Sequence, residues 1–279
     1  MEIHQSAPYA QYIRLLGWSV EYLGGQAVFL RKIPFLGTIA KFQRFDKIPS
    51  LKETKAFLKL YNVKTFAAEP AASVSQSLFS YFMKRVGAYV KINTSPFLPT
   101  KTVLVDLTPS EEEIFKNFSE AKRRAVRRAQ KNSVAVEESD NIHAMLEVKK
   151  RASGLFGFLV VSNIFPLWKT LAPKHATILL AFHPTSPKPL GGILLLFWNK
   201  RALYWLVGAT KQGKRLFVPT LLAWEAMRIS KRRGMKEFDF LGVNDERLPK
   251  DNPSWRGFTK FKEGFGGQSL YYPYSRPSP

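Results

Sequence analysis

The sequence lacks cysteine altogether and contains only four histidines, His4, His143, His175 and His183, in 279 residues. Without cysteine the chain has no disulfide, no thiolate nucleophile and no Cys-ligated zinc site. The histidines do not lie at metal-ligand spacing, so the sequence favours neither a metal centre nor a Ser-His-Asp triad. Catalysis by this chain would have to use other side chains.

Acidic residues are also scarce relative to basic ones. The chain has 21 Asp and Glu against 43 Lys and Arg, which gives a formal net charge of +22. Such an excess indicates polyanionic partners, which can be nucleic acid, an anionic membrane surface or phosphorylated substrates. The competing interpretation is an ordinary basic enzyme, which the charge alone does not exclude.

No apolar run is long enough to span a bilayer as a helix. The most apolar stretch, residues 191–198, is far shorter than the ~20 residues that a transmembrane helix needs. The N-terminus has no basic region followed by an apolar core, so it does not resemble a signal peptide. We therefore expect a cytoplasmic protein, with contact at the inner membrane face left open.

Apolar periodicity and turn signals predict an α/β (α+β) protein. Strands and helices mix in two similar passes, and Ser95-Pro96-Phe97-Leu98-Pro99 marks a break between them. We therefore predict an N-terminal domain at residues 1–100 and a C-terminal domain at residues 101–279. Because 45% of the residues are hydrophobic, the chain can bury a sizeable core.

Residues 109–131 have the pattern of one long helix whose C-terminal half is basic. Acidic residues fill its first turn and basic residues its last turns, which complements the helix macrodipole. Arg123 and Arg127, spaced i, i+4, can hold one anionic group together. The competing interpretation is a solvated charged face.

A second basic loop, residues 208–215, precedes a predicted helix and suits a phosphate. An acetyl-CoA cradle would need an Arg or Gln, then a glycine, a spacer and a small residue before the helix. Here Gln212-Gly213 is followed by Lys214, Arg215 and Leu216, so that pattern is absent. The loop therefore argues against an ordinary acetyl-CoA acyltransferase.

The most informative segment is Phe258-Thr259-Lys260-Phe261-Lys262-Glu263-Gly264-Phe265-Gly266-Gly267. If it is extended, alternation places Phe258, Lys260 and Lys262 on one face and Phe261 on the other. The glycines permit positive φ or close approach of the backbone to a ligand. Lys262 is then a candidate cation for an anion or a developing oxyanion, although a strand edge with solvated lysines is the simpler alternative.

Short motifs in a characteristic order carry a family resemblance. They are Leu16-Gly17-Trp18, Glu69-Pro70, Val105-Asp106-Leu107, Arg123 and Arg127 followed by Val134-Ala135-Val136, and residues 204–209, 222–226, 238–243 and 261–267. Through this series the sequence resembles the FemABX family of peptidoglycan-bridge aminoacyltransferases over most of its length. The resemblance implies two tandem GNAT-like domains, with mixed sheets flanked by helices.

The resemblance also implies that an amino acid moves from aminoacyl-tRNA to a stem-peptide amine of a UDP- or lipid-linked peptidoglycan precursor. The lysine of the family's final motif falls on Lys262, which would stabilise charge at the tRNA terminus or on the tetrahedral intermediate, and Phe261 would position the reacting end. Glu69 would bind or deprotonate the acceptor amine, unless it is a structural carboxylate. Arg151 and Lys260 are further substrate-binding candidates.

The chemistry implied by the resemblance fits the composition. Aminoacyl esters are already activated, so amide formation needs no cofactor or metal, only proximity, a neutral amine and oxyanion stabilisation. The sequence has no heptad insertion for the coiled-coil arm of longer relatives, and residues 157–161 are more apolar than expected for an acceptor region. Two other functions stay open: a GNAT-like acyltransferase with another acyl donor, and a non-catalytic RNA- or membrane-binding protein.

Overall fold

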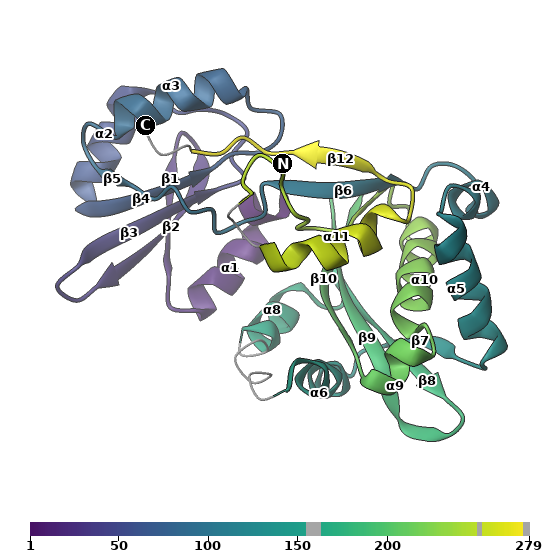
Figure 1. The fold of residues 1–279 in the computed structure, drawn as a ribbon. Coiled ribbons are helices and arrows are strands. Elements are labelled where there is room, and N and C mark those ends of the chain that lie inside the picture. The colour runs from purple at the N-terminus through teal and green to yellow at the C-terminus, as the bar shows by residue number, and fades with distance from the viewer. Residues whose placement is uncertain (155–162, 250–252, 276–279) are drawn as a thin grey trace. The chain divides into compact units, whose positions relative to one another are not determined.

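The computed structural model describes residues 1–154, 163–249 and 253–275, so the apolar residues 157–161 lie outside the described part. The chain forms two compact units (Figure 1). The N-terminal unit comprises Met1–Lys101 and Leu270–Pro279, and the C-terminal unit comprises Thr102–Ser269. The end of the chain thus groups with the N-terminal unit, whereas the sequence placed it with the second domain.

The N-terminal unit is built on a five-stranded sheet of order β1-β2-β3-β4-β5. Pairing is antiparallel from β1 to β3 and parallel from β3 to β5. Its elements are η1 (Ile3–Gln5), α1 (Ala7–Leu15), β1 (Ser19–Leu23), β2 (Gln26–Ile33), β3 (Gly37–Gln43), α2 (Leu51–Leu60), β4 (Val63–Glu69), α3 (Gln76–Val86) and β5 (Lys91–Ile92).

Local sequence signals and aromatic packing explain this unit. A capping box begins α2, since the Glu53 backbone N–H donates to the Ser50 hydroxyl at 3.2 Å. Phe42 and Phe45 stack in the core with ring centroids 4.0 Å apart, and Phe79 packs beside them. The core therefore ends at the carboxyl ends of β3 and β4, where Glu69 lies.

The C-terminal unit is built on a seven-stranded sheet of order β12-β6-β11-β10-β9-β8-β7, with β12 and β6 at the unit boundary. Its strands are β6 (Lys101–Asp106), β7 (Ala135–Ser139), β8 (Ala176–His183), β9 (Ser186–Trp198), β10 (Arg201–Ala209), β11 (Glu237–Asp239) and β12 (Gln268–Tyr271). Its helices are α4 (Glu111–Lys116), α5 (Glu120–Lys131), α6 (Ile142–Ser153), α8 (Ile164–Leu171), α9 (Lys211–Arg215), α10 (Val218–Arg232), η3 (Pro253–Trp255) and α11 (Arg256–Glu263).

Two adjacent glycines in β9 show how helices cover both faces of this sheet. A Cβ at Gly191 would lie 2.5 Å from Val218 of α10, and one at Gly192 would lie 2.7 Å from Met145 of α6. Successive strand residues face opposite sides of a sheet, so α10 and α6 pack on opposite faces of β9. The missing side chains let both helices approach the strand closely.

The single helix predicted for residues 109–131 is wrong, because two helices, α4 and α5, occupy this stretch. Ser110 caps the first helix, with Glu113 closing the capping box. Ser119 caps the second, and its backbone N–H donates to the Gly264 carbonyl at 2.8 Å. A contact distant in sequence therefore holds the break, and local propensity does not reveal it.

Within the described residues, no helix combines the length and the apolar character needed to cross a membrane. The longest apolar secondary-structure element is instead a strand, β9, whose residues 190–197 are buried between helices. The apolar run noted in the sequence is thus part of the core of the C-terminal unit.

Candidate functional site

The segment that carries Lys262 is a helix, so the faces that an extended conformation would give do not apply. In α11, Phe258 and Lys262 lie one turn apart, and the Lys262 ammonium nitrogen is 5.2 Å from the Phe258 ring centroid. Lys260 does not share this face as predicted, and it is exposed to solvent. Helical spacing thus separates the two lysines that strand alternation would have paired.

Lys262 is held by carbonyl groups rather than by a salt bridge in the described structure. Its Nζ donates to the carbonyl oxygens of Leu241, at 3.1 Å, and Gly242, at 2.6 Å. Burial lowers the pKa of Lys262 to about 8, and the nearby charge of Asp239 partly opposes this shift. An ammonium has three N–H groups, so one of them remains available for a ligand.

Lys122 is a second desolvated lysine beside α11, and the sequence interpretation missed it. Its Nζ lies 3.7 Å from the ring centroid of Phe261 and 5.2 Å from that of Phe265. Burial lowers its pKa to about 8 as well. The sequence showed Lys122 only as one of several basic residues of a helix. Only the break between α4 and α5 places Lys122 in the first turn of a helix, where a cation opposes the macrodipole, so no local sequence signal marked it.

The glycines after α11 allow close packing against the protein itself. A Cβ at Gly266, where φ is +76°, would lie 2.3 Å from the Asn117 carbonyl oxygen, and one at Gly267 would lie 2.5 Å from that of Leu104. The predicted close approach of backbone is therefore present, but its partner is the turn between α4 and α5 and the strand β6. This packing fixes the end of α11 beside the start of α5.

The predicted arginine sites lie on other helices. On α5, Arg123 donates through Nη1 to the carbonyls of Lys116, at 2.7 Å, and Phe118, at 2.5 Å, whereas Arg127 is exposed. Arg123 therefore already stabilises the end of α4, and a joint anion clamp with Arg127 stays a prediction. Arg151, at the end of α6, is exposed and donates to the Pro189 carbonyl at 2.7 Å.

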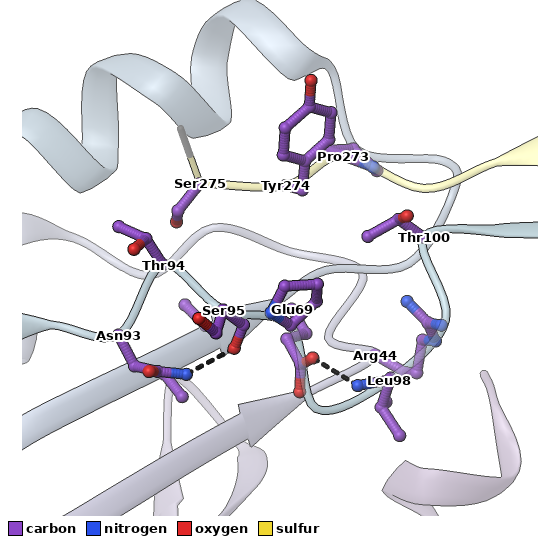
Figure 2. Close-up of a pocket in the computed structure, with 13 residues that line it drawn as sticks. Arg44, Glu69, Asn93, Thr94, Ser95, Leu98, Thr100, Pro273, Tyr274 and Ser275 are labelled. Atoms are coloured by element: carbon purple, nitrogen blue, oxygen red, sulfur yellow. Dashed lines mark hydrogen bonds between the residues drawn. The ribbon is translucent and has the colours of Figure 1, made fainter. Parts of the chain in front are cut away.

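Glu69 lies in the N-terminal unit, at the end of β4, where it lines a pocket (Figure 2). The pocket is a small hollow between the loop at residues 93–100 and residues 273–275. Glu69 Oε1 accepts the Leu98 backbone N–H at 2.6 Å, and Oε2 accepts the Gln43 side-chain amide at 3.0 Å. Two neutral donors thus fix the carboxylate, and each oxygen keeps a lone pair for a further donor.

Other polar groups of this pocket are also distinctive. Buried Arg44 donates to the carbonyls of Pro70 and Pro99 at 3.3 and 2.6 Å, and its guanidinium lies 3.5 Å from the Tyr272 ring centroid. The Ser275 hydroxyl is buried without a hydrogen-bond partner among the described residues. Because buried polar groups are nearly always paired, a polar ligand or water is the expected partner of this hydroxyl.

Comparison with known proteins identifies the fold. Residues 116–248 match the acetyltransferase (GNAT) domain family. Among solved structures the chain is similar to FemX, with a TM-score of 0.77 and 15% identity, over 97% of this chain and 90% of that one. The tandem GNAT-like fold implied by the FemABX resemblance, without a coiled-coil arm in the described residues, is therefore confirmed.

Two further structures share the fold. The C-terminal domain of a putative lysylphosphatidylglycerol synthetase from Agrobacterium fabrum has a TM-score of 0.58 and 12% identity over 97% of this chain and 87% of that one. A tandem GNAT protein from the clavulanic acid biosynthesis pathway has a TM-score of 0.51 and 13% identity over 92% and 82%. No curated protein sequence matches the chain. The chain has the fold of a GNAT-type acyltransferase, which supports a transferase.

Proposed function

We propose that the protein transfers an amino acid from aminoacyl-tRNA to an amine of a peptidoglycan precursor stem peptide. The observation that carries the proposal is the setting of Lys262, a desolvated ammonium with a free N–H beside Phe258. An N–H donor in a partly dry site stabilises a developing oxyanion far better than one in water. The similarity of the fold to FemX and to a putative lysylphosphatidylglycerol synthetase supports this choice of reaction class.

The proposed reaction balances without a cofactor. The acceptor amine attacks the ester carbonyl carbon, the carbonyl oxygen becomes an oxyanion, and the ester C–O bond then breaks to release the terminal tRNA hydroxyl. A base takes the proton lost from the amine, and the leaving oxygen receives a proton. Lys262 is the candidate donor to the oxyanion, Phe261 the positioning residue, and Glu69 the candidate group for the amine.

The charge of the chain supports polyanionic substrates. With a net charge of +22, the protein attracts tRNA and a pyrophosphate-linked precursor through long-range electrostatics. Arg123, Arg127, Arg151 and Lys260 are the proposed contacts for these substrates. Whether the precursor is UDP-linked or lipid-linked decides whether an anionic membrane is a partner as well.

The test is a transfer assay with purified protein, a mixture of charged tRNAs, and UDP- and lipid-linked precursors, with products identified by mass spectrometry. We expect Lys262→Ala to reduce transfer about 100- to 1,000-fold, because one oxyanion donor is lost, while tRNA affinity changes little. Arg256→Ala, at an exposed basic position of the same helix, is the matched control, and we expect it to change transfer less than about threefold. Wild-type protein that forms no aminoacylated precursor would contradict the proposal.

A second candidate is acyl transfer from another donor, which the GNAT family match favours. The segment before α10 argues against acetyl-CoA as the donor, because it forms the short helix α9 instead of an open loop. It also packs closely on the protein, since a Cβ at Gly213 would lie 2.5 Å from the Leu190 carbonyl oxygen. Parallel assays with acetyl-CoA as donor, and with phosphatidylglycerol as acceptor, distinguish these reactions. Salt-sensitive RNA binding with no transfer in any assay would instead indicate a binding protein.

A further inference from the structure

The hairpin of β2 and β3 (Figure 1) ends in a turn that exposes two large apolar side chains. Phe35 is 107% exposed and Leu36 is 70% exposed, and Pro34 before them is also exposed. Large apolar side chains side by side at the end of a hairpin cost solvation free energy and add nothing to the core of the unit. These two side chains would therefore be placed more favourably in an apolar environment outside the protein.

The backbone holds these side chains outward in an unfavourable conformation. Phe35 has a φ of +64°, which is uncommon for a bulky residue, and Gly37 follows with a φ of +82°. The Leu36 N–H closes the turn by donating to the carbonyls of Ile33, at 3.2 Å, and Pro34, at 2.8 Å. Strain of this kind persists where the surrounding structure imposes it, and it is a reason to look for function.

Basic side chains surround the tip. Arg31, Lys32 and Lys64 are exposed, and Gly37 sits so close to Lys64 that a Cβ there would lie 2.3 Å from the lysine Cγ. No acidic residue occurs between Glu21 and Asp46 in the sequence. The hairpin end therefore combines an apolar tip with uncompensated positive charge behind it.

The other hairpins of the chain show that a tight turn does not require an apolar tip. The turn between β8 and β9 carries Pro184 and Thr185 at exposed positions, and that between β9 and β10 carries Asn199 and Lys200. Asn199 and Lys200 also have positive φ, as Phe35 does. Polar residues thus serve where only a turn is needed.

We propose that the β2–β3 tip inserts Phe35 and Leu36 into the surface of an anionic lipid bilayer while Arg31, Lys32 and Lys64 contact its headgroups. Apolar side chains at the acyl boundary and cations at the headgroups are the two contributions that anchor peripheral proteins. Charge complementarity favours an anionic bilayer over a protein surface as the occupant. The inference extends the proposed function by naming its membrane contact, yet it is tested without tRNA or precursor, so either can fail alone.

The absence of cysteine allows a direct test with the full chain. A single Phe35→Cys or Leu36→Cys variant is labelled with an environment-sensitive fluorophore and mixed with vesicles of phosphatidylcholine, alone or with added phosphatidylglycerol. We expect a blue shift only with the anionic vesicles, and a loss of the shift in high salt. Thr185→Cys, at a polar hairpin tip, is the matched control and should show no shift. A tip probe that behaves like the Thr185→Cys probe would overturn the proposal.

Flotation of unlabelled variants separates the two contributions. We expect Phe35→Ser with Leu36→Ser to lower vesicle binding at least about tenfold, because both apolar anchors are lost. Arg31→Gln with Lys32→Gln should lower binding to anionic vesicles about fivefold for each charge removed, with no effect on neutral vesicles. Phe165→Ser, an exposed apolar residue of the C-terminal unit, is the control. Equal binding by wild type and the Phe35/Leu36 variant would contradict the insertion.

Discussion

Glu69 and Lys262 were predicted for complementary parts of one reaction, and their surroundings differ in an instructive way. Neither forms a salt bridge in the described residues, and each is held by neutral groups. Both oxygens of Glu69 already accept an N–H, one from the backbone of Leu98 and one from Gln43. Lys262 keeps an unused N–H, and its pKa is lowered to about 8 by burial.

Hydrogen bonds to neutral groups keep the charges of Glu69 and Lys262 available to a substrate. A salt bridge would cancel the charge that a substrate needs, whereas neutral partners orient the group and leave its charge in place. For Glu69 the same hydrogen bonds also join β3, β4 and the loop before β6, so this carboxylate has a structural role in any case. For Lys262 the carbonyls only position the end of a long side chain, and its replacement by an apolar residue also removes the cost of burying its charge.

Among the variants that test this comparison, we expect Glu69→Gln to change stability and transfer the most. The new amide presents an NH₂ group where the carboxylate accepted from two donors, so one buried N–H loses its acceptor. We expect a loss of roughly 1–3 kcal/mol in the free energy of unfolding, together with a fall in transfer of about 100-fold or more if Glu69 serves the amine. Urea denaturation and single-turnover transfer measure the two effects.

The two readouts distinguish the roles of Glu69. Gln43→Ala removes one of the same hydrogen bonds without touching the carboxylate, so it is the control for the structural contribution. If Gln43→Ala lowers transfer as much as Glu69→Gln does, the carboxylate acts through the fold and the role in deprotonation is wrong. If Glu69→Gln lowers stability alone, Glu69 is a structural residue.

Local signals predicted much of the fold, and long-range contacts account for what they missed. The acidic first turn predicted for the helix from residue 109 depends on residues close in sequence, and it is present in α4. The break at Ser119 depends on the Gly264 carbonyl, which is 145 positions away. No sequence window contains both partners of that hydrogen bond, so the continuous helix was the natural prediction.

The sequence predicted only part of the candidate site, because the site also depends on contacts between residues distant in sequence. The Phe and Lys residues of α11 alternate, which suggested a strand, but Phe258, Phe261 and Phe265 also recur at the spacing of three and four residues that marks a helix. The aromatic side chains of Phe261 and Phe265 pack against each other, with ring centroids 5.3 Å apart. Lys122 could not be assigned to this cluster from sequence, because only the folded chain brings α5 beside α11.

A smaller effect, on the pH dependence of transfer, sharpens the assignment of Lys262. Only its protonated form donates to an oxyanion, and the protonated fraction falls as pH rises through a pKa of about 8. We therefore expect the ratio of the wild-type rate to the Lys262→Arg rate to fall about tenfold per pH unit above 8, since a guanidinium stays charged. The ratio cancels changes in the substrate that both enzymes share.

Lys122 provides the control for this titration, because its pKa is also about 8. We expect Lys122→Met to keep the decline of the rate at high pH. If the decline disappears in Lys122→Met and persists in Lys262→Arg, then Lys122 is the titrating group. The role proposed for Lys262 must then be assigned to Lys122.

The smallest expected effect concerns stability, and it compares both desolvated lysines with the exposed Lys260. The pKa of Lys262 and of Lys122 is lowered from 10.5 to about 8 in the folded chain. Between these values the unfolded chain binds more protons, so the free energy of unfolding gains a positive dependence on pH from both lysines. Below pH 8 both states are protonated, and burial of the charges disfavours folding. We expect Lys262→Met to be more stable than wild type at pH 7 by on the order of 1 kcal/mol, and Lys122→Met by less, because Lys122 is only half-buried and solvent screens its charge. Both differences should shrink toward pH 10. Urea denaturation across this range measures the free energy of unfolding, and that of Lys260→Met should depend on pH as that of wild type does.

A Lys262→Met variant with the same pH profile as Lys260→Met would show that Lys262 is as well solvated as Lys260, and the argument for a dry oxyanion donor would fail with it.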